Sequence, residues 1–206
     1  MAPPPPVAGA LGPEPQYEVI PLRGIAREVA AQLPPGARVT VTASPAQGLP
    51  ATIETACELA EQGFRAIPHL AARMLHGRSE VEELLERLAE AGVAEVFVIA
   101  GDASLPAGDF PGALELLEAL SSAGSAMTVG VGAHPEGHPH LADAEATRLL
   151  QVKAEHATYA VTQMCFAAAP LLEWTRQLRD ADITLPVRPG IAAAVGTARL
   201  LRIGAR

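Results

Sequence analysis

Short apolar segments alternate with helix-like segments along this chain, and that alternation limits the possible folds more than any other feature. One unit is complete in VAEVFVIAGD, residues 93–102, which is apolar from Val96 to Ala100, stops at Gly101 and continues with Asp102. A short apolar run between turn signals is typical of a strand buried on both faces of a parallel sheet. Functional residues in such sheets collect just past the carboxyl ends of the strands. Asp102 is therefore a candidate site residue, although an Asp there can equally cap a turn.

The same pattern recurs seven times. Strands are predicted over residues 17–21, 38–43, 64–68, 96–100, 126–131, 158–162 and 184–187. Helices are predicted over residues 25–33, 50–62, 79–90, 109–123, 143–155 and 170–180, with a last helix from about Val195. Ser79 and Glu82 have the spacing of a capping box at the start of the third helix. Strands that alternate with helices predict a parallel α/β fold.

Two parallel architectures compete. A doubly wound sheet usually carries a glycine-rich phosphate turn after its first strand, and YEVIPLRGI has no G-x-G-x-x-G. Polar residues instead lie on or just after six strands, which favours a (β/α)8 TIM-type barrel. These residues are Glu18, Thr42, His69, Asp102, His134 with Glu136, and Gln163. Seven βα units can be counted and the eighth is missing, so either the chain is truncated or something else closes the barrel, such as a partner chain in a homo-oligomer.

Composition narrows the class of protein. Residues 1–15, MAPPPPVAGALGPEP, lack the basic start of a signal peptide and are predicted to be a disordered leader, with the barrel domain over residues 16–206. The net charge of −8 argues against a nucleic-acid partner. No apolar run reaches the roughly 18 residues of a membrane span. Two cysteines are too few for a disulfide framework. Together these features predict a cytoplasmic protein without a membrane partner.

Glu18 lies among apolar residues in the first predicted strand. A carboxylate there is costly to bury and tends to have a raised pKa, which suits a general acid working near neutral pH. The residues alone also allow an ordinary ion pair with Arg23 or Arg188 at the barrel mouth. Both interpretations stay open at this point.

Two further polar features have competing interpretations. Gln163 ends a buried strand, where its amide needs partners and could pair with a heterocycle or serve the structure. The segment HPEGHPH, residues 134–140, places three histidines around Glu136. Its spacing matches no zinc motif of hydrolases and its prolines indicate a rigid turn, so no metal ligand is assigned. A metal-holding (β/α) enzyme remains an alternative, and for His69 a core position is the simplest interpretation.

Seven short motifs occur in the order found in one known family. They are YEVIP, VTVTA, IPHLA, IAGD, HPEGHP, VTQMCF and RPGI, and they span residues 17–191. With these motifs the chain resembles the catalytic barrel of methylenetetrahydrofolate reductases. Single motifs are not specific, but seven in order are.

The resemblance implies a role for each matching position. Glu18 matches the general acid that protonates N10 of the folate, and Asp102 matches the aspartate that binds the pterin and tunes the charge of the reacting centre. Gln163 matches the glutamine that bonds the pterin edge, with Phe166 in the same substrate-binding motif. The cofactor-facing positions implied in the same way are Thr42, His69, Gly101, His134 and Lys153.

Departures from the family pattern concern the flavin. Ala100 stands where the family has an arginine, and His134 stands where it has a tyrosine. The resemblance therefore implies a divergent member in which the family cofactor FAD is doubtful and NADH or NADPH passes hydride directly to the folate. The expected reaction is reduction of 5,10-methylenetetrahydrofolate to 5-methyltetrahydrofolate in one-carbon and methionine metabolism. The alternative is a non-catalytic or truncated folate-binding barrel.

Overall fold

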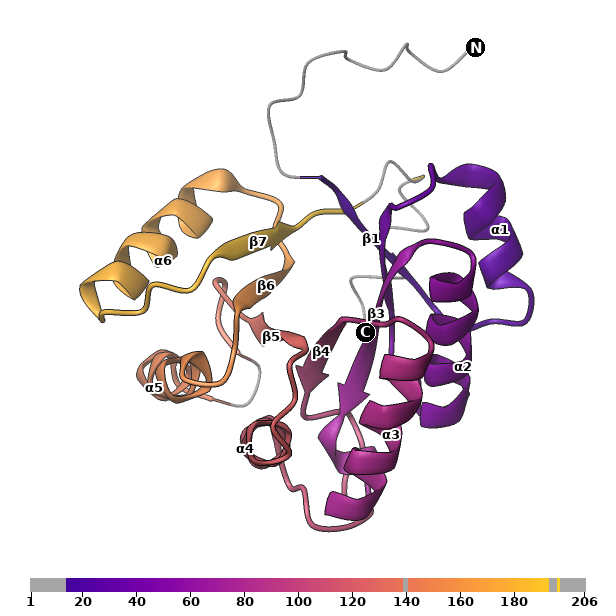
Figure 1. Ribbon diagram of the computed structural model, residues 1–206. Coiled ribbons are helices and arrows are strands. Elements are labelled where there is room, and N and C mark those ends of the chain that lie inside the picture. Colours follow the sequence, from indigo (N-terminus) through magenta and orange to yellow (C-terminus); the bar gives the residue numbers. More distant parts are fainter. Residues whose placement is uncertain (1–13, 139–140, 193–195, 197–206) are drawn as a thin grey trace, which may run out of the picture.

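The computed structural model describes residues 14–138, 141–192 and 196. It shows one curled sheet of seven parallel strands with helices around its outer side (Figure 1). The strands are β1 (Gln16–Val19), β2 (Arg38–Val41), β3 (Arg65–Ala71), β4 (Glu95–Ile99), β5 (Thr128–Ala133), β6 (Tyr159–Met164) and β7 (Val187–Gly190). The helices are α1 (Ile25–Gln32), α2 (Gly48–Glu61), η1 (Ala72–Met74), α3 (Arg78–Glu90), α4 (Ala113–Ser122), α5 (Asp143–Ala154) and α6 (Ala168–Asp180).

Each strand pairs with the next one in the chain, so β1 and β7 are the two edges of the sheet. Sequential parallel pairing with helical connections is the (β/α) barrel arrangement, and the predicted fold class is confirmed to that extent. The part of the chain described by the structure contains no eighth strand. Its sheet curls like a barrel but does not close between β1 and β7. The predicted last helix, from about Val195, lies outside the described residues.

Most predicted elements are found, and three details of the prediction are wrong. The seventh strand was expected at residues 184–187 but begins at Val187, because Ile183 and Leu185 belong to a buried connection instead. Ser79 lies inside α3, whose N-cap is Gly77 without a side-chain bond, so the capping box does not form. The short helix η1 was not predicted.

Strands β3 and β6 run further than their apolar signals suggested. His69 therefore lies within β3 and Gln163 within β6, although both were expected at or after the strand end. Pro68 does not end β3, and its register partner on β2 is Val41. The polar side chains consequently belong to the barrel wall.

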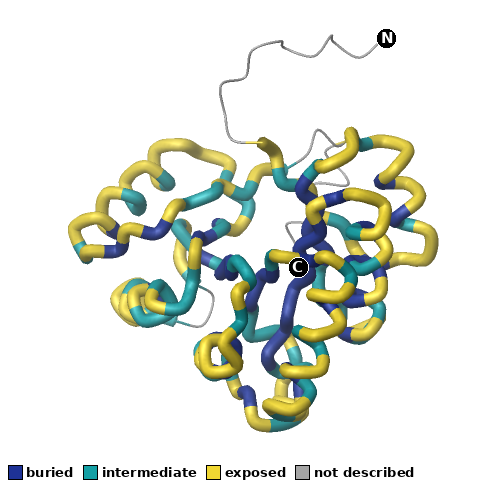
Figure 2. The backbone as a smooth tube through the Cα atoms, in the orientation of Figure 1, coloured by how far each residue is buried: buried dark blue, intermediate teal, exposed yellow. Residues whose placement is uncertain are grey.

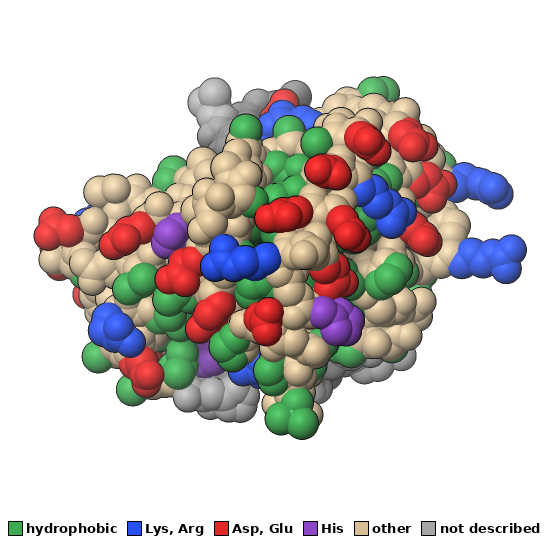
Figure 3. Space-filling model, turned by 60° about the horizontal axis from the view of Figure 1, so that its bottom comes forward, with side chains coloured by type: hydrophobic (Ala, Val, Ile, Leu, Met, Phe, Trp, Pro, Cys, Tyr) green, Lys and Arg blue, Asp and Glu red, His purple; other side chains and the backbone are tan. Residues whose placement is uncertain are grey.

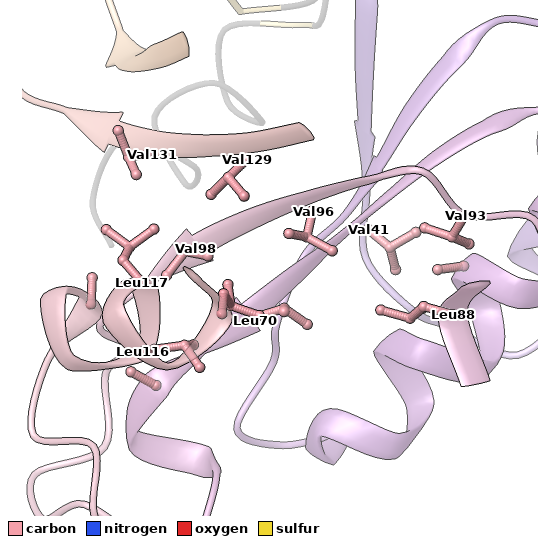
Figure 4. Close-up of a cluster of buried hydrophobic side chains, with 14 of the residues drawn as sticks. Val41, Leu70, Leu88, Val93, Val96, Val98, Leu116, Leu117, Val129 and Val131 are labelled. Atoms are coloured by element: carbon pink, nitrogen blue, oxygen red, sulfur yellow. The ribbon is translucent and has the colours of Figure 1, made fainter. Parts of the chain in front are cut away.

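A large apolar cluster fills the space between the sheet and the helices. In Figure 4, Val98 of β4 lies beside Leu117 of α4, and Val96 and Val129 belong to the same cluster. Full burial of one such side chain contributes about 1.5–3 kcal/mol. Figure 2 shows the result, with the central strands largely buried, the edge strands β1 and β7 partly exposed, and the outer faces of the helices exposed. No helix among the described residues is long and apolar enough to cross a membrane.

Polar and charged side chains at or near the amino-terminal ends of the strands fill that end of the barrel interior. Arg38 and Arg188 both bond the carboxylate of Glu95, and Arg188 also donates to the side chain of Gln16 at 2.8 Å. The guanidinium of Arg188 lies 3.7 Å from the centre of the Tyr159 ring. We refer to these five residues as the barrel floor. Their mutual bonds tie β1, β2, β4, β6 and β7 together below the site described next.

Candidate active site

The interior of the barrel is apolar just above the floor. Along β4, Val96 and Val98 face the helices, so Phe97 between them faces inward. Phe97 forms a second apolar cluster with Ile67 and Tyr159. These rings separate the floor from the carboxyl-terminal half of the interior.

Two glycines of β5 show where the filled part ends. A side chain at Gly130 would overlap the Tyr159 ring and lie within 2.7 Å of the Phe97 ring, so the rings occupy that level completely. Gly132 lies two residues further on the same face, and no atom lies within 4 Å of the position that its Cβ would take. The interior is therefore open from Gly132 toward the carboxyl ends of the strands. We refer to this open region, with Glu18, His69 and Gln163 on the surrounding strands and Thr42 directly after β2, as the barrel mouth.

Glu18 projects from β1 into this region. Its side chain keeps 65% of its surface exposed, yet the surrounding strands desolvate the carboxyl group and raise its pKa. The ionisable group paired with it is His69, whose Nε2 lies 3.9 Å from Oε2 of Glu18. In the described part of the chain Glu18 pairs with neither Arg23 nor Arg188, so the simple ion-pair interpretation is wrong.

His69 is a buried neighbour of that carboxyl group. Its ring stacks on Phe97 with centroids 4.7 Å apart, and burial lowers its pKa to about 4. The imidazole is therefore neutral at physiological pH and does not compete with Glu18 for a proton. Thr42 follows β2 nearby and is fixed by two bonds, from its N–H to the Val19 carbonyl and from the Thr52 hydroxyl to its own carbonyl.

Gly101 and Asp102 follow β4, as the sequence predicted. Gly101 has φ +86°, and a side chain there would lie 3.0 Å from Cβ of Ala71, so this position requires glycine. Asp102 is exposed, and within the described residues its carboxylate makes no hydrogen bond. It is free to meet a ligand at the barrel mouth.

Gln163 and Phe166 complete the predicted substrate-binding set. The expectation that Gln163 would be a buried amide is wrong, since its residue is exposed in β6. Its backbone carbonyl accepts a hydrogen bond from the Thr162 hydroxyl at 2.7 Å. Its side-chain amide makes no hydrogen bond within the described residues and is available to a ligand. Phe166, two residues after β6, is 65% exposed and presents an aromatic face to solvent.

Comparison with known proteins decides the family. The family model described as methylenetetrahydrofolate reductase matches residues 20–205, which is most of the chain. The chain belongs to the methylenetetrahydrofolate reductase family. The family predicted from the seven motifs is thus confirmed. All predicted site residues except Glu18, which precedes the match by two residues, lie within the matched span.

Individual relatives are distant. Methylenetetrahydrofolate reductase 2 of Saccharomyces cerevisiae is 26% identical over 136 residues, which cover 60% of this chain and 23% of that protein. The chain therefore spans about a quarter of the length of this curated relative. Among solved structures, 2,3-dimethylmalate lyase of the PEP mutase/isocitrate lyase superfamily superposes with a TM-score of 0.55 at 12% identity. That superposition covers 93% of this chain and 74% of the lyase, and supports the fold alone.

The positions that the sequence predicts to face a cofactor are divided between two places. Thr42, His69 and Gly101 lie around the barrel mouth, whereas His134 and Lys153 line a cavity between α5, α6 and the segment after β5, which Gly132 also borders. That cavity has a volume of about 120 Å³. Sites that hold cofactors usually measure roughly 300–1,000 Å³.

Burial disfavours the protonated forms of two basic side chains in that cavity. Burial lowers the pKa of Lys153, and burial with the neighbouring His138 lowers the pKa of His134 to about 4. The rings of the two histidines meet edge to face with centroids 4.5 Å apart. Ala100 contributes no cation.

Other candidate sites carry less chemistry. Among the described residues, no three His, Cys, Asp or Glu side chains are close enough to hold a metal ion, and His140 of the HPEGHPH segment lies outside that part of the chain. Another cavity, of about 520 Å³, lies between α3 and the segments that precede β4 and follow α4, and is lined mainly by apolar residues such as Leu85 and Met127. No predicted site residue lines it.

The sequence did not single out two groups of residues that position the site. Glu95 and Arg38 begin strands at inward-facing positions, and a charged residue at that point of an apolar strand was a usable signal. Arg73 follows β3 and bonds the loop that carries Asp102. Nothing in the sequence indicated this contact, because it joins η1 to the connection between β4 and α4, which lies about 30 to 40 residues further along the chain.

Proposed function

We propose that this family member reduces 5,10-methylenetetrahydrofolate to 5-methyltetrahydrofolate with NADH or NADPH. The observation that carries the proposal is the Glu18 carboxyl group, which faces an open barrel mouth with a raised pKa beside a neutral histidine. A carboxyl group in this state can hold a proton at a pH where an exposed glutamate would have lost it. It is the group needed to open the five-membered ring of the substrate.

The proposed reaction has two steps, ring opening and hydride transfer. Glu18 donates a proton to N10 of the folate, the bond between N10 and the methylene carbon breaks, and its electron pair stays on N10. The resulting iminium carbon on N5 then accepts a hydride from C4 of the reduced nicotinamide and becomes the methyl group. A positioned general acid contributes about 10²- to 10⁴-fold to such a step.

Asp102 and Gln163 are proposed to hold the pterin. The Gln163 amide can donate to and accept from the heterocycle, and the Asp102 carboxylate can accept from its N–H groups. Phe166 offers an exposed aromatic surface beside them. The side chains of Asp102 and Gln163 make no hydrogen bonds within the described residues, so binding breaks none of the protein's own.

Direct transfer from the nicotinamide, without FAD, is part of this proposal. It is supported by Ala100, by His134 and by the small cavity around Lys153. Loss of the charge-assisted bond of the arginine that Ala100 replaces, which contributes about 1.5–3 kcal/mol, weakens FAD binding by roughly 10- to 10²-fold. Titration of FAD into the protein while following flavin fluorescence tests this, with Ala100→Arg as the variant expected to gain binding. Tight stoichiometric binding by the unmodified protein contradicts it.

The decisive test of function is oxidation of NADH or NADPH that depends on added methylenetetrahydrofolate, with 5-methyltetrahydrofolate identified as the product. Calorimetry with the folate separates the alternatives. Folate binding without turnover would identify a non-catalytic folate-binding barrel, an alternative suggested by the open sheet. Neither binding nor turnover would reject the proposed site.

A further inference from the structure

The loop that carries Asp102, residues 100–112 between β4 and α4, is held by the segment after β3. The Arg73 N–H donates to the Ala100 carbonyl at 3.0 Å. The Arg73 carbonyl accepts from the Ala107 N–H at 2.9 Å. The backbone of one residue thus contacts the loop, which we call the Asp102 loop, at its start and in its middle.

The side chain of Arg73 extends this contact to both ends of the loop. Its Nη1 donates to the Ala103 carbonyl at 3.1 Å, and its Nε donates to the Pro111 carbonyl at 2.8 Å. A guanidinium presents its donors in a rigid fork, and bonds with a charged donor are stronger than neutral ones. Arg73 therefore joins the residue directly after Asp102 to the end of the same loop.

A close backbone contact supports the same arrangement from the other side. The Asp109 N–H donates to the His76 carbonyl at 3.0 Å. A side chain at Gly108 would overlap that carbonyl, so the loop can approach this closely only because residue 108 is glycine. The contact does not depend on the charge of Arg73.

We infer that Arg73 is a positioning residue for the proposed folate site. It fixes the Asp102 loop so that the Asp102 carboxylate is already in place when the pterin binds. The inference rests on the function proposed above, but the order of the loop can be measured without folate. Asp102 is exposed and its side chain has no bond of its own in the described residues, so the loop backbone alone sets its position. Fixing a loop before binding improves affinity because less ordering is needed on binding.

The test compares Arg73→Met with two related variants and a control. Arg73→Lys keeps the charge but cannot bridge two carbonyls, and Gly108→Ala disturbs the loop while Arg73 is intact. Arg27→Met is the matched control, because Arg27 is exposed on α1 and makes no side-chain hydrogen bond in the described residues. Each protein is measured by amide hydrogen exchange without ligand and by calorimetry with methylenetetrahydrofolate.

We expect Arg73→Met and Gly108→Ala to speed exchange of the Ala107 and Asp109 amides by about 10-fold or more, since a locally opened loop loses its protection. Arg73→Lys should fall between Arg73→Met and the unmodified protein. Folate affinity should drop about 10-fold in Arg73→Met and be unchanged in Arg27→Met, a drop comparable to the loss of one such bond.

A double-mutant cycle with Asp102→Ala separates positioning from general damage. If Arg73 acts through Asp102, the double variant binds folate about as weakly as Asp102→Ala alone, whereas independent effects multiply to about 100-fold. Faster exchange with unchanged folate affinity, or fully multiplied effects, overturns the inference and leaves the proposed function standing. Absence of folate binding in the unmodified protein instead rejects the proposed function, and this positioning role with it.

Discussion

At the barrel floor, the two arginines Arg38 and Arg188 share the carboxylate of Glu95. At the barrel mouth, the carboxyl of Glu18 and the amide of Gln163 make no hydrogen bond within the described residues. The floor side chains of Arg38 and Glu95 are only 8% and 12% exposed, whereas that of Glu18 is 65% exposed. The same barrel thus uses its polar residues in opposite ways at its two ends.

The difference has a physical cause. A buried charge must be paired, because an uncompensated one costs several kcal/mol. The floor pairs its charges internally, although Arg38 Nε and the Tyr159 hydroxyl find no hydrogen-bond partner among the described residues. Burial and the nearby Glu95 carboxylate raise the pKa of Tyr159. The mouth leaves polar groups available to a ligand, as expected at the carboxyl ends of barrel strands. The face in Figure 3 carries more acidic than basic side chains, in agreement with the net charge of −8.

Glu18→Gln should have the largest effect on activity and almost none on stability. We expect turnover to fall by about 10²- to 10⁴-fold, because the general acid is lost. The free energy of unfolding should change by less than about 0.5 kcal/mol, as for other exposed side chains that make no hydrogen bond within the described residues. Steady-state kinetics and urea unfolding measure the two quantities. Near-normal turnover in the Gln variant would remove Glu18 from the mechanism.

Glu95→Ala should show the opposite behaviour. It leaves Arg38 buried without its partner, so we expect the free energy of unfolding to fall by about 3–5 kcal/mol. Glu14→Ala is the matched control, since Glu14 pairs with Arg65 in an exposed ion pair worth at most about 1 kcal/mol. Urea unfolding of both variants checks the prediction. Equal losses of unfolding free energy in the two variants would show that the buried floor pair stabilises the fold no more than an exposed ion pair.

Acid should destabilise the mouth through His69. Its pKa is about 4 when folded and 6.5 when exposed, so the unfolded chain takes up a proton first as the pH falls. The stabilisation is complete above pH 6.5 and is lost progressively down to about pH 4, by roughly 3 kcal/mol in all. His69→Gln should lack this part of the pH dependence, while His134 keeps its own. Parallel stability curves for the two proteins between pH 7 and about pH 4 would contradict the assigned burial of His69.

Removal of the proposed pterin contacts should have the smallest effect. We expect Gln163→Ala and Asp102→Ala each to weaken folate binding by about 1–3 kcal/mol, because polar groups of the bound pterin lose a partner. Stability should hardly change, since neither side chain bonds the protein. Calorimetry with the folate and thermal unfolding give the two values. Unchanged affinity in both variants would mean that the site has been placed wrongly.

The sequence by itself determined the order of the elements. Apolar and β-branched runs such as RVTV and EVFVI can be buried only as strands between helices, and the structure has both at the predicted places. The seven motifs also determined the family, because their order along the chain does not depend on folding. Strand ends were less certain, as His69 and Gln163 show, since main-chain pairing continues past the apolar signal.

Tertiary structure decided which polar residues meet. Arg38 and Glu95 are 57 positions apart, and Gln16 and Arg188 are 172 apart, yet each pair bonds across the barrel. These contacts depend on the register and curl of the whole sheet, which no local pattern encodes. The attachment of Arg73 to the Asp102 loop has the same origin. Local propensity and burial determine the elements, whereas the free energy of pairing distant charges and carbonyls is defined only once the barrel has formed.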